Sequence, residues 1–243
     1  MPEARRKTMI VTGASQGIGA GVARAFLRLG YAVVANSRKV TESATFASDP
    51  QLALVDGNIG EAATAARVAG TAIEKFGAID GVVNNAGIFF SKRFIDYTAD
   101  DFNLLSETNL AGYIHITQLA VKRMLAQGRG GSVIAITAST AEHPIAGSNG
   151  SVPMITKGGL EAVTRNLAME YARDGIRFNA VSPGIVDTPM HNGESRELLN
   201  QQSPMGEISE VEDIVQAVVY LTEARHVTGE ILHVDAGAHI GKW

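Results

Sequence analysis

The sequence contains no cysteine, so it can form neither a disulfide framework nor a thiolate metal site. It also lacks a strong charge of one sign, and a net charge of −4 favours neither nucleic acid nor an anionic membrane surface as a partner. No apolar run is long enough to span a bilayer, and the N-terminus lacks the apolar segment of a signal peptide. We therefore expect a cytoplasmic protein that binds neither nucleic acid nor membrane.

Strand and helix patterns alternate along the 243 residues, 45% of which are hydrophobic. This alternation predicts an α/β fold with a parallel sheet covered by helices on both faces. The predicted strands are residues 9–11, 31–35, 52–55, 81–83, 132–137, 176–181 and 230–234, and the predicted helices are 19–30, 59–76, 100–126, 154–173 and 211–223. Residues 38–50 are too few for a full helix, and residues 186–209 are expected to form a loop with a helical turn.

A glycine-rich turn joins the first strand to the first helix and is the most informative stretch of the chain. It contains Gly13, Gly17 and Gly19, which directly follow the apolar run at residues 9–11. Glycine lets the backbone turn sharply and approach a ligand closely. The helix that follows points its free N–H groups and the positive end of its dipole at the turn, which favours an anion there. We therefore predict a phosphate-binding site at this turn.

Three other segments also follow predicted strands, at residues 84–87, 137–139 and 182–184. Ligands of open parallel sheets bind beyond the carboxyl ends of the strands. These segments and the glycine-rich turn are therefore expected to meet at one rim of the sheet.

Taken in order, these segments resemble the short-chain dehydrogenase/reductase family. Residues 12–19 match its T-G-x-x-x-G-x-G loop, residues 84–87 its N-N-A-G segment, and residues 182–184 the loop that closes over nicotinamide. Lys157 and residues 228–237 match its lysine helix and its final strand. The resemblance covers nearly the whole chain. It implies one dinucleotide-binding domain over residues 1–243, built on a Rossmann-type doubly wound sheet of seven mostly parallel strands.

The same resemblance implies the site residues. Asn109 corresponds to the asparagine that holds a water for proton relay, Ser139 follows the fifth strand, and Lys157 also bonds the nicotinamide ribose. These three are the expected catalytic residues, and no metal site is expected. The expected cofactor-binding residues are Gly13, Ser15, Gln16, Gly17, Ile18, Gly19, Ser37, Arg38, Asp56, Asn85, Ala86, Gly87, Lys157, Pro183, Gly184 and Thr188.

One position departs from the family pattern. The family places a catalytic tyrosine four residues before the lysine, and this chain has Pro153 there. A proline is tolerated in the first turn of a helix, where its missing N–H costs nothing, and Ser151 is positioned to cap that helix. The fold is therefore expected to survive, but the usual general acid is absent.

General acid–base catalysis is worth about 10²–10⁴ in rate, so the loss of the tyrosine weakens hydride transfer without forbidding it. Three replacement acids remain open: Lys157 itself, a water ordered by Asn109, and His143 on the loop after Ser139. Alternatively, the substrate needs little protonation, as an iminium or a conjugated acceptor would. The substrate pocket is expected from residues 88–93, 141–148 and 189–206, which show no diagnostic charge pair.

The end of the second strand bears on the choice of cofactor. Relatives that prefer NAD place an aspartate there, but this chain has Ser37 followed by Arg38 and Lys39. Without the carboxylate nothing repels a 2′-phosphate, and the guanidinium offers it a donor fork. NADP(H) is therefore favoured over NAD(H). Asp56 matches the family position that contacts the adenine amino group.

Three functions remain open from the sequence alone. The first is an NADP(H)-dependent oxidoreductase that transfers a hydride to a carbonyl or imine-like small molecule with a non-standard proton donor. The second is an NADP(H)-binding sensor with little catalysis, and the third is an inactive partner of an active homologue. The family resemblance also implies a homo-oligomer, most simply a tetramer, with contacts through residues 103–127, residues 163–172 and the C-terminal segment.

Overall fold

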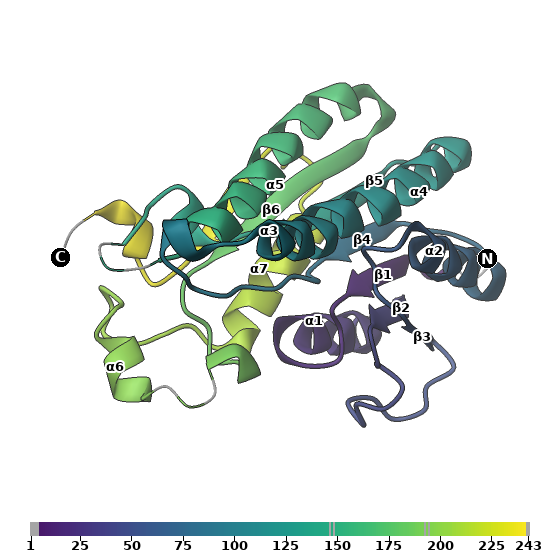
Figure 1. Ribbon diagram of the computed structural model, residues 1–243. Coiled ribbons are helices and arrows are strands. Elements are labelled where there is room, and N and C mark those ends of the chain that lie inside the picture. Colours follow the sequence, from purple (N-terminus) through teal and green to yellow (C-terminus); the bar gives the residue numbers. More distant parts are fainter. Residues whose placement is uncertain (1–4, 146, 148, 192, 194, 242–243) are drawn as a thin grey trace.

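The structure is a computed structural model that describes residues 5–145, 147, 149–191, 193 and 195–241. Its centre is one seven-stranded sheet in the order β3-β2-β1-β4-β5-β6-β7 (Figure 1). The strands are β1 Thr8–Thr12, β2 Ala32–Ser37, β3 Leu52–Asp56, β4 Gly81–Asn84, β5 Gly131–Ile136, β6 Ile176–Pro183 and β7 Ile231–Val234. Every strand pair is parallel, so the predicted doubly wound sheet is confirmed, and it is parallel throughout rather than mostly parallel.

Two layers of helices cover the sheet, as the near-continuous apolar strands require. One face packs against α2 (Ala62–Phe76), α4 (Gly112–Gln127) and α5 (Ser151–Glu170). The other face packs against α1 (Gly17–Arg28) and α7 (Val211–Glu223). Figure 1 shows α6 (Arg196–Asn200) away from the sheet, within the segment predicted to be a loop with a helical turn.

The long helix expected over residues 100–126 is interrupted. It begins as α3 (Ala99–Ser106), passes through a π-helical turn at Glu107–Ala111, and continues as α4. Asn109 lies inside this π turn. Such turns are rare and are often found at functional sites, and apolar periodicity does not reveal them because only the hydrogen-bond ladder changes.

Two helix starts differ by three residues from the sequence prediction. The helix expected from residue 59 starts at Ala62, and the one expected from residue 154 starts at Ser151. Because Ser151 is already helical, Gly150 is the N-cap residue and no side chain caps α5. The predicted capping role of Ser151 is therefore wrong, whereas Pro153 does lie in the first helical turn.

The order of the strands in the sheet determines where the ligand-binding crevice lies. From β1 the chain turns toward β2 and β3, whereas β4 to β7 extend in the opposite direction from β1. The ends of β1 and β4 therefore form the switch point at which doubly wound sheets bind their ligands. Across the described part of the chain, no helix has the length and hydrophobicity needed to cross a membrane.

Candidate active site

The glycine-rich turn after β1 is shaped so that larger residues do not fit. Gly13 has a φ of +66°, and a Cβ there would lie 2.8 Å from the Cα of Ala86. A Cβ at Gly19 would lie 2.5 Å from Nδ2 of Asn85 and would also collide with the Gly13 carbonyl oxygen. Atoms this close must move apart, so the turn accepts only glycine at both positions. The result is an open backbone cradle beside the start of α1.

Hydrogen bonds fasten this turn to the loop after β4. The hydroxyl of Thr12 accepts from the N–H groups of Asn85 and Ala86, at 3.1 and 3.0 Å. In return, Nδ2 of Asn85 donates to the carbonyl oxygens of Thr12 and Gly13, at 3.0 and 3.1 Å. The predicted cofactor residues Asn85 and Ala86 therefore hold the turn in shape.

The start of α1 leaves its first N–H groups without a side-chain cap. Gln16 is the N-cap residue, and its side chain makes no capping hydrogen bond. A hollow of about 510 Å³ lies here, and it is flanked by the cations of Arg24 and Lys39. Its other lining residues are Ser15, Gln16, Gly17, Ala20, Glu42, Ser43 and Thr45. Free N–H groups, a helix dipole and two cations fit the phosphate groups of a dinucleotide.

The end of β2 differs in part from the sequence prediction. Ser37 pairs in register with Asp56. Both carboxylate oxygens of Asp56 accept from Thr41, one from its N–H at 3.0 Å and one from its hydroxyl, and these bonds lower the pKa of Asp56. Arg38 is exposed and does not line the hollow. Arg24, which the sequence analysis missed, lines it together with Gly17 and Ala20, and this helical spacing was the available signal.

A second cavity of about 650 Å³ lies beyond the carboxyl ends of the strands. Eight predicted site residues line it: Ile18, Asn85, Gly87, Ser139, Lys157, Pro183, Gly184 and Thr188. All three predicted pocket segments contribute, with Ile88, Phe89, Ser91, Ile145, Gly147, Met190, His191, Leu199, Gln202 and Ser203. Positions 146, 148, 192 and 194 of those segments lie outside the described residues.

Lys157 is the cation at the base of this cavity. Its Nζ donates to the carbonyl oxygen of Ile136 at 2.8 Å. Burial lowers the pKa of Lys157 to about 8, and Glu161, one helical turn later, opposes that shift. An ammonium with such a pKa is still mostly protonated at neutral pH and releases its proton more readily than an ordinary lysine.

Asn109 is placed behind the cavity rather than at its wall. Its side chain is buried, Oδ1 accepts from the N–H of Ile88 at 2.9 Å, and Nδ2 donates to the carbonyl of Ile88 and to the hydroxyl of Thr156. A Cβ at Gly87 would lie 3.3 Å from both Oδ1 of Asn109 and Nζ of Lys157. Asn109 therefore fixes the strand-end loop and borders the lysine through Gly87.

The first turn of α5 presents Pro153 one turn before Lys157, on the same helix face. Pro153 is buried, and its carbonyl accepts from the hydroxyl of Thr156 at 2.7 Å. It does not line the cavity, whereas Met154 does. No tyrosine is found among the described residues that line this cavity. The geometry therefore provides Ser139 and Lys157, without a phenol beside them.

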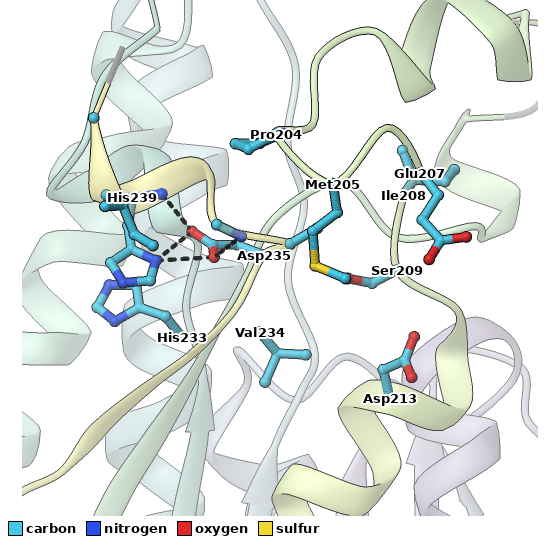
Figure 2. A pocket seen from close by; sticks show the side chains of 14 residues that line it. Pro204, Met205, Glu207, Ile208, Ser209, Asp213, His233, Val234, Asp235 and His239 are labelled. Atoms are coloured by element: carbon cyan, nitrogen blue, oxygen red, sulfur yellow. Dashed lines mark hydrogen bonds and ion pairs between the residues drawn. The ribbon is translucent and has the colours of Figure 1, made fainter. Parts of the chain in front are cut away.

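The sequence analysis did not single out two ionisable residues of the cavity, His191 and Asp235. His191 lies in the predicted pocket segment 189–206, and Asp235 lies in the final strand motif at residues 228–237. Asp235 is paired with Nδ1 of His239 at 2.9 Å (Figure 2). Asp235 also lines a second hollow of about 800 Å³, which adjoins the cavity. His143, a candidate acid from sequence, lines neither space.

Comparison with known proteins places this geometry in a family. The family model described as enoyl-(acyl carrier protein) reductase matches residues 13–239. The L-rhamnose 1-dehydrogenase (NAD(P)(+)) of Azotobacter vinelandii is 35% identical over 96% of this chain and 97% of its own length.

Two solved structures are similar over the whole fold. The 3-ketoacyl-(acyl-carrier-protein) reductase of Brucella melitensis, complexed with NADH, has a TM-score of 0.90 and 27% identity over 98% of this chain and all of its own. A tyrosine-to-phenylalanine variant of ElxO with NADPH bound has a TM-score of 0.90 and 26% identity, over 97% of this chain and all of its own. The dinucleotide cradle, the serine–lysine cavity and these relatives agree, and the chain belongs to the short-chain dehydrogenase/reductase family of oxidoreductases.

Proposed function

We propose that this protein is an NADP(H)-dependent oxidoreductase that reduces the carbonyl or imine-like group of a small molecule. The observation that supports the proposal is that Ser139 and Lys157 line one cavity together with Ile18 of the glycine-rich turn and with Pro183, Gly184 and Thr188 of the nicotinamide loop. The bound cofactor would supply the hydride. A substrate in this cavity would lie beside two of the three predicted catalytic residues, an arrangement that this chemistry needs.

In this proposal Lys157 donates the proton that a tyrosine donates elsewhere in the family. Ser139 donates a hydrogen bond to the substrate oxygen and holds it near the ammonium. A pKa of about 8 keeps Lys157 protonated at neutral pH while making the proton transfer easier. Pro153 cannot take this role because it carries no ionisable group.

The preference for NADP(H) rests on charge at the hollow of about 510 Å³ beside the start of α1, which we call the outer hollow. Ser37 contributes no carboxylate, and the carboxylate of Asp56 is engaged by Thr41. Arg24 and Lys39 place two cations at the hollow, although Glu42 offsets Lys39 through an ion pair of 3.1 Å. A 2′-phosphate would meet net positive charge there.

The test is the oxidation of NADPH with a panel of diketones and ketoesters by wild type, Lys157→Ala and Ser139→Ala. Wild type should turn over, and each variant should lose about 10²–10⁴ in kcat/KM. Fluorescence titration with NADPH and NADH gives the cofactor preference separately. Equal affinity for the two cofactors would refute the NADP(H) preference while leaving the oxidoreductase proposal to the turnover assay.

A second candidate, a cofactor-binding protein without turnover, is favoured by two observations. From the first turn of α5 the apolar Met154 lines the cavity, and a variant of the similar protein ElxO in which phenylalanine replaces a tyrosine has NADPH bound. Tight NADPH binding without oxidation of NADPH by any substrate of the panel would favour this candidate, as a sensor or as the inactive partner of a homologue.

We further propose a cytoplasmic homotetramer. Residues 103–127 and 163–172, which the family resemblance implies in contacts, carry large apolar side chains that are 42–81% exposed: Leu104, Ile114, Leu125 and Met169. Covering such side chains stabilises an assembly. Analytical ultracentrifugation at micromolar concentration should give a tetramer, and a monomer would contradict the proposal.

A further inference from the structure

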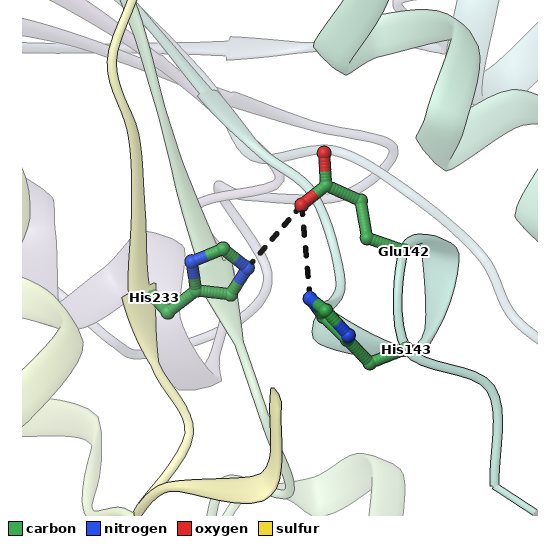
Figure 3. A group of neighbouring side chains, drawn as sticks. All are labelled: Glu142, His143 and His233. Carbon is green, nitrogen blue, oxygen red and sulfur yellow. Dashed lines mark ion pairs between the residues drawn. The ribbon is translucent and has the colours of Figure 1, made fainter. Parts of the chain in front are cut away.

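Three donor atoms from two distant parts of the chain converge beside β7. Glu142 and His143 directly follow the short helical turn η3 (Ser139–Ala141), and His233 lies on β7. Nε2 of His233 is 3.6 Å and Nε2 of His143 is 4.0 Å from the same oxygen, Oε2 of Glu142 (Figure 3). One ligand atom from each residue lies within 4.8 Å of the others.

These separations are too long for hydrogen bonds, yet they suit ligands that share an ion. Nε2 of His233 is buried and has no hydrogen-bond partner among the described residues. In a tetrahedral zinc site with bonds of about 2.0–2.2 Å, two ligand atoms lie about 3.3–3.6 Å apart. The 3.6 Å separation between His233 and Glu142 matches this spacing, and a rotation of the exposed His143 would shorten its 4.0 Å separation and bring in the third atom.

A neighbouring side chain holds the Glu142 carboxylate in an orientation suited to binding a metal ion. Oε1 of Glu142 accepts from Nη2 of Arg165 at 2.8 Å, which leaves Oε2 directed at the two imidazoles. The ion pair with Arg165 holds the carboxylate of Glu142 in place beside the two imidazole rings.

Neighbouring groups fix the ring of His233 and contribute charge. The ring of His239 stacks on it with centroids 4.1 Å apart, and His239 is itself held by Asp235. The carboxylate of Asp235 adds negative charge near the cluster. The other described charged groups beside Glu142 are Arg165, which pairs with it, and the carboxyl of Glu161.

We propose that Glu142, His143 and His233 bind one divalent transition-metal ion of the zinc class. Two imidazoles and one carboxylate form a donor set that zinc uses with a fourth position left for water or another ligand. The ion would join the loop after Ser139 to β7. The sequence does not reveal this site because His233 is 90 residues away from His143 and no ligand spacing motif is present.

The test is a titration of chelator-treated, tag-free protein with Co²⁺, followed by calorimetry and by visible absorption, and repeated with Zn²⁺. Wild type should bind one ion per chain. His233→Ala and Glu142→Gln should each weaken binding at least about tenfold. His226→Ala is the matched control, because this exposed histidine lies outside the cluster and its loss should leave the affinity unchanged.

Circular dichroism of each variant separates lost ligands from lost folding, and the isosteric Glu142→Gln keeps the site testable if His233→Ala fails to fold. Wild type that binds no ion overturns the proposal. Binding that survives in both His233→Ala and Glu142→Gln, or that weakens equally in His226→Ala, also overturns it. None of these outcomes depends on NADPH turnover, so the proposed oxidoreductase activity is tested separately.

Discussion

The two regions that border the lysine cavity differ in how tightly their neighbours constrain them. The glycine-rich turn is surrounded by backbone, so that a single Cβ at Gly13 or Gly19 would meet atoms of the loop after β4. The first turn of α5 is buried at Pro153, but the rules for helix starts allow more than one residue type at this position, and proline satisfies them. The chain therefore keeps the family pattern at the turn and departs from it at α5.

This difference separates the requirements of binding from those of proton transfer. A cradle for phosphate is made of backbone, and its shape cannot change without loss of fit. A proton donor is one side chain of a helix, and a proline in its place in the first helical turn leaves the helical backbone as it was. Loss of the tyrosine is therefore compatible with an intact cofactor site.

We expect the largest effect from restoring the family's tyrosine at position 153, in the first turn of α5. Pro153→Tyr places a phenol one turn before Lys157, and we expect reduction of activated ketones to rise by about 10²–10⁴ if the cavity admits the ring. NADPH oxidation by wild type and variant measures this gain. The double variant with Lys157→Ala should lose it. A wild type that is faster than Pro153→Tyr would show that another acid is already effective there.

We expect the next largest effect from a substitution in the glycine-rich turn after β1. Gly19→Ala forces a Cβ against Asn85 and the Gly13 carbonyl, and overpacking of this kind costs about 1–3 kcal/mol. We expect NADPH affinity to fall by about 100-fold at the upper end of that cost, measured by fluorescence titration.

Gly70→Ala is the control for that change. Gly70 lies within α2, and outside the helix's own backbone the nearest atom to a Cβ there would be Oε1 of Glu74, at 4.0 Å, so the change should raise stability by about 0.5–1 kcal/mol. Unchanged NADPH affinity in Gly19→Ala would refute the assignment of this turn to phosphate binding.

A smaller effect sharpens the role of Lys157. The ammonium must be protonated to act as an acid, and its pKa is about 8. We therefore expect kcat/KM for ketone reduction to be level below pH 8 and to fall about tenfold per pH unit above it. Alcohol oxidation should instead rise through the same range, because it needs the neutral amine.

In this pH range Glu161 is the described ionisable neighbour that acts on the lysine, and its carboxylate raises the pKa of Lys157. Glu161→Gln should therefore shift the fall in the rate profile to lower pH. A profile that stays level to pH 10 would contradict proton donation by Lys157.

The smallest effect distinguishes three cations near the outer hollow. Arg24 and Lys39 line it and Arg38 does not, so Arg24→Ala and Lys39→Ala should each lower NADPH affinity by about fivefold, as expected of exposed charges. Arg38→Ala should change it less, and NADH, which lacks the 2′-phosphate, should lose less affinity than NADPH in Arg24→Ala and Lys39→Ala. A larger loss in Arg38→Ala than in the other two would restore the assignment made from sequence.

Much of the fold could be predicted because its signals are local. Each buried strand is a short apolar run, and the loops after β1, β4 and β6 carry recognisable residues at fixed spacing. The π turn around Asn109 could not be predicted, because it changes the backbone ladder without changing apolar periodicity. The start of α5 at Ser151 was missed because proline and glycine both mark helix boundaries without saying which residue is the cap.

The sequence by itself determined the order of strands and helices, the glycine-rich cradle and the absence of tyrosine before Lys157. These depend on residue type and on short spacings, which the chain fixes directly. Only the tertiary structure decided that Arg24 rather than Arg38 lines the outer hollow, that Asn109 lies behind Gly87, and that His233 meets Glu142. These placements depend on segments that are far apart in sequence but meet at the same edge of one sheet. No local sequence pattern specifies which segments meet there.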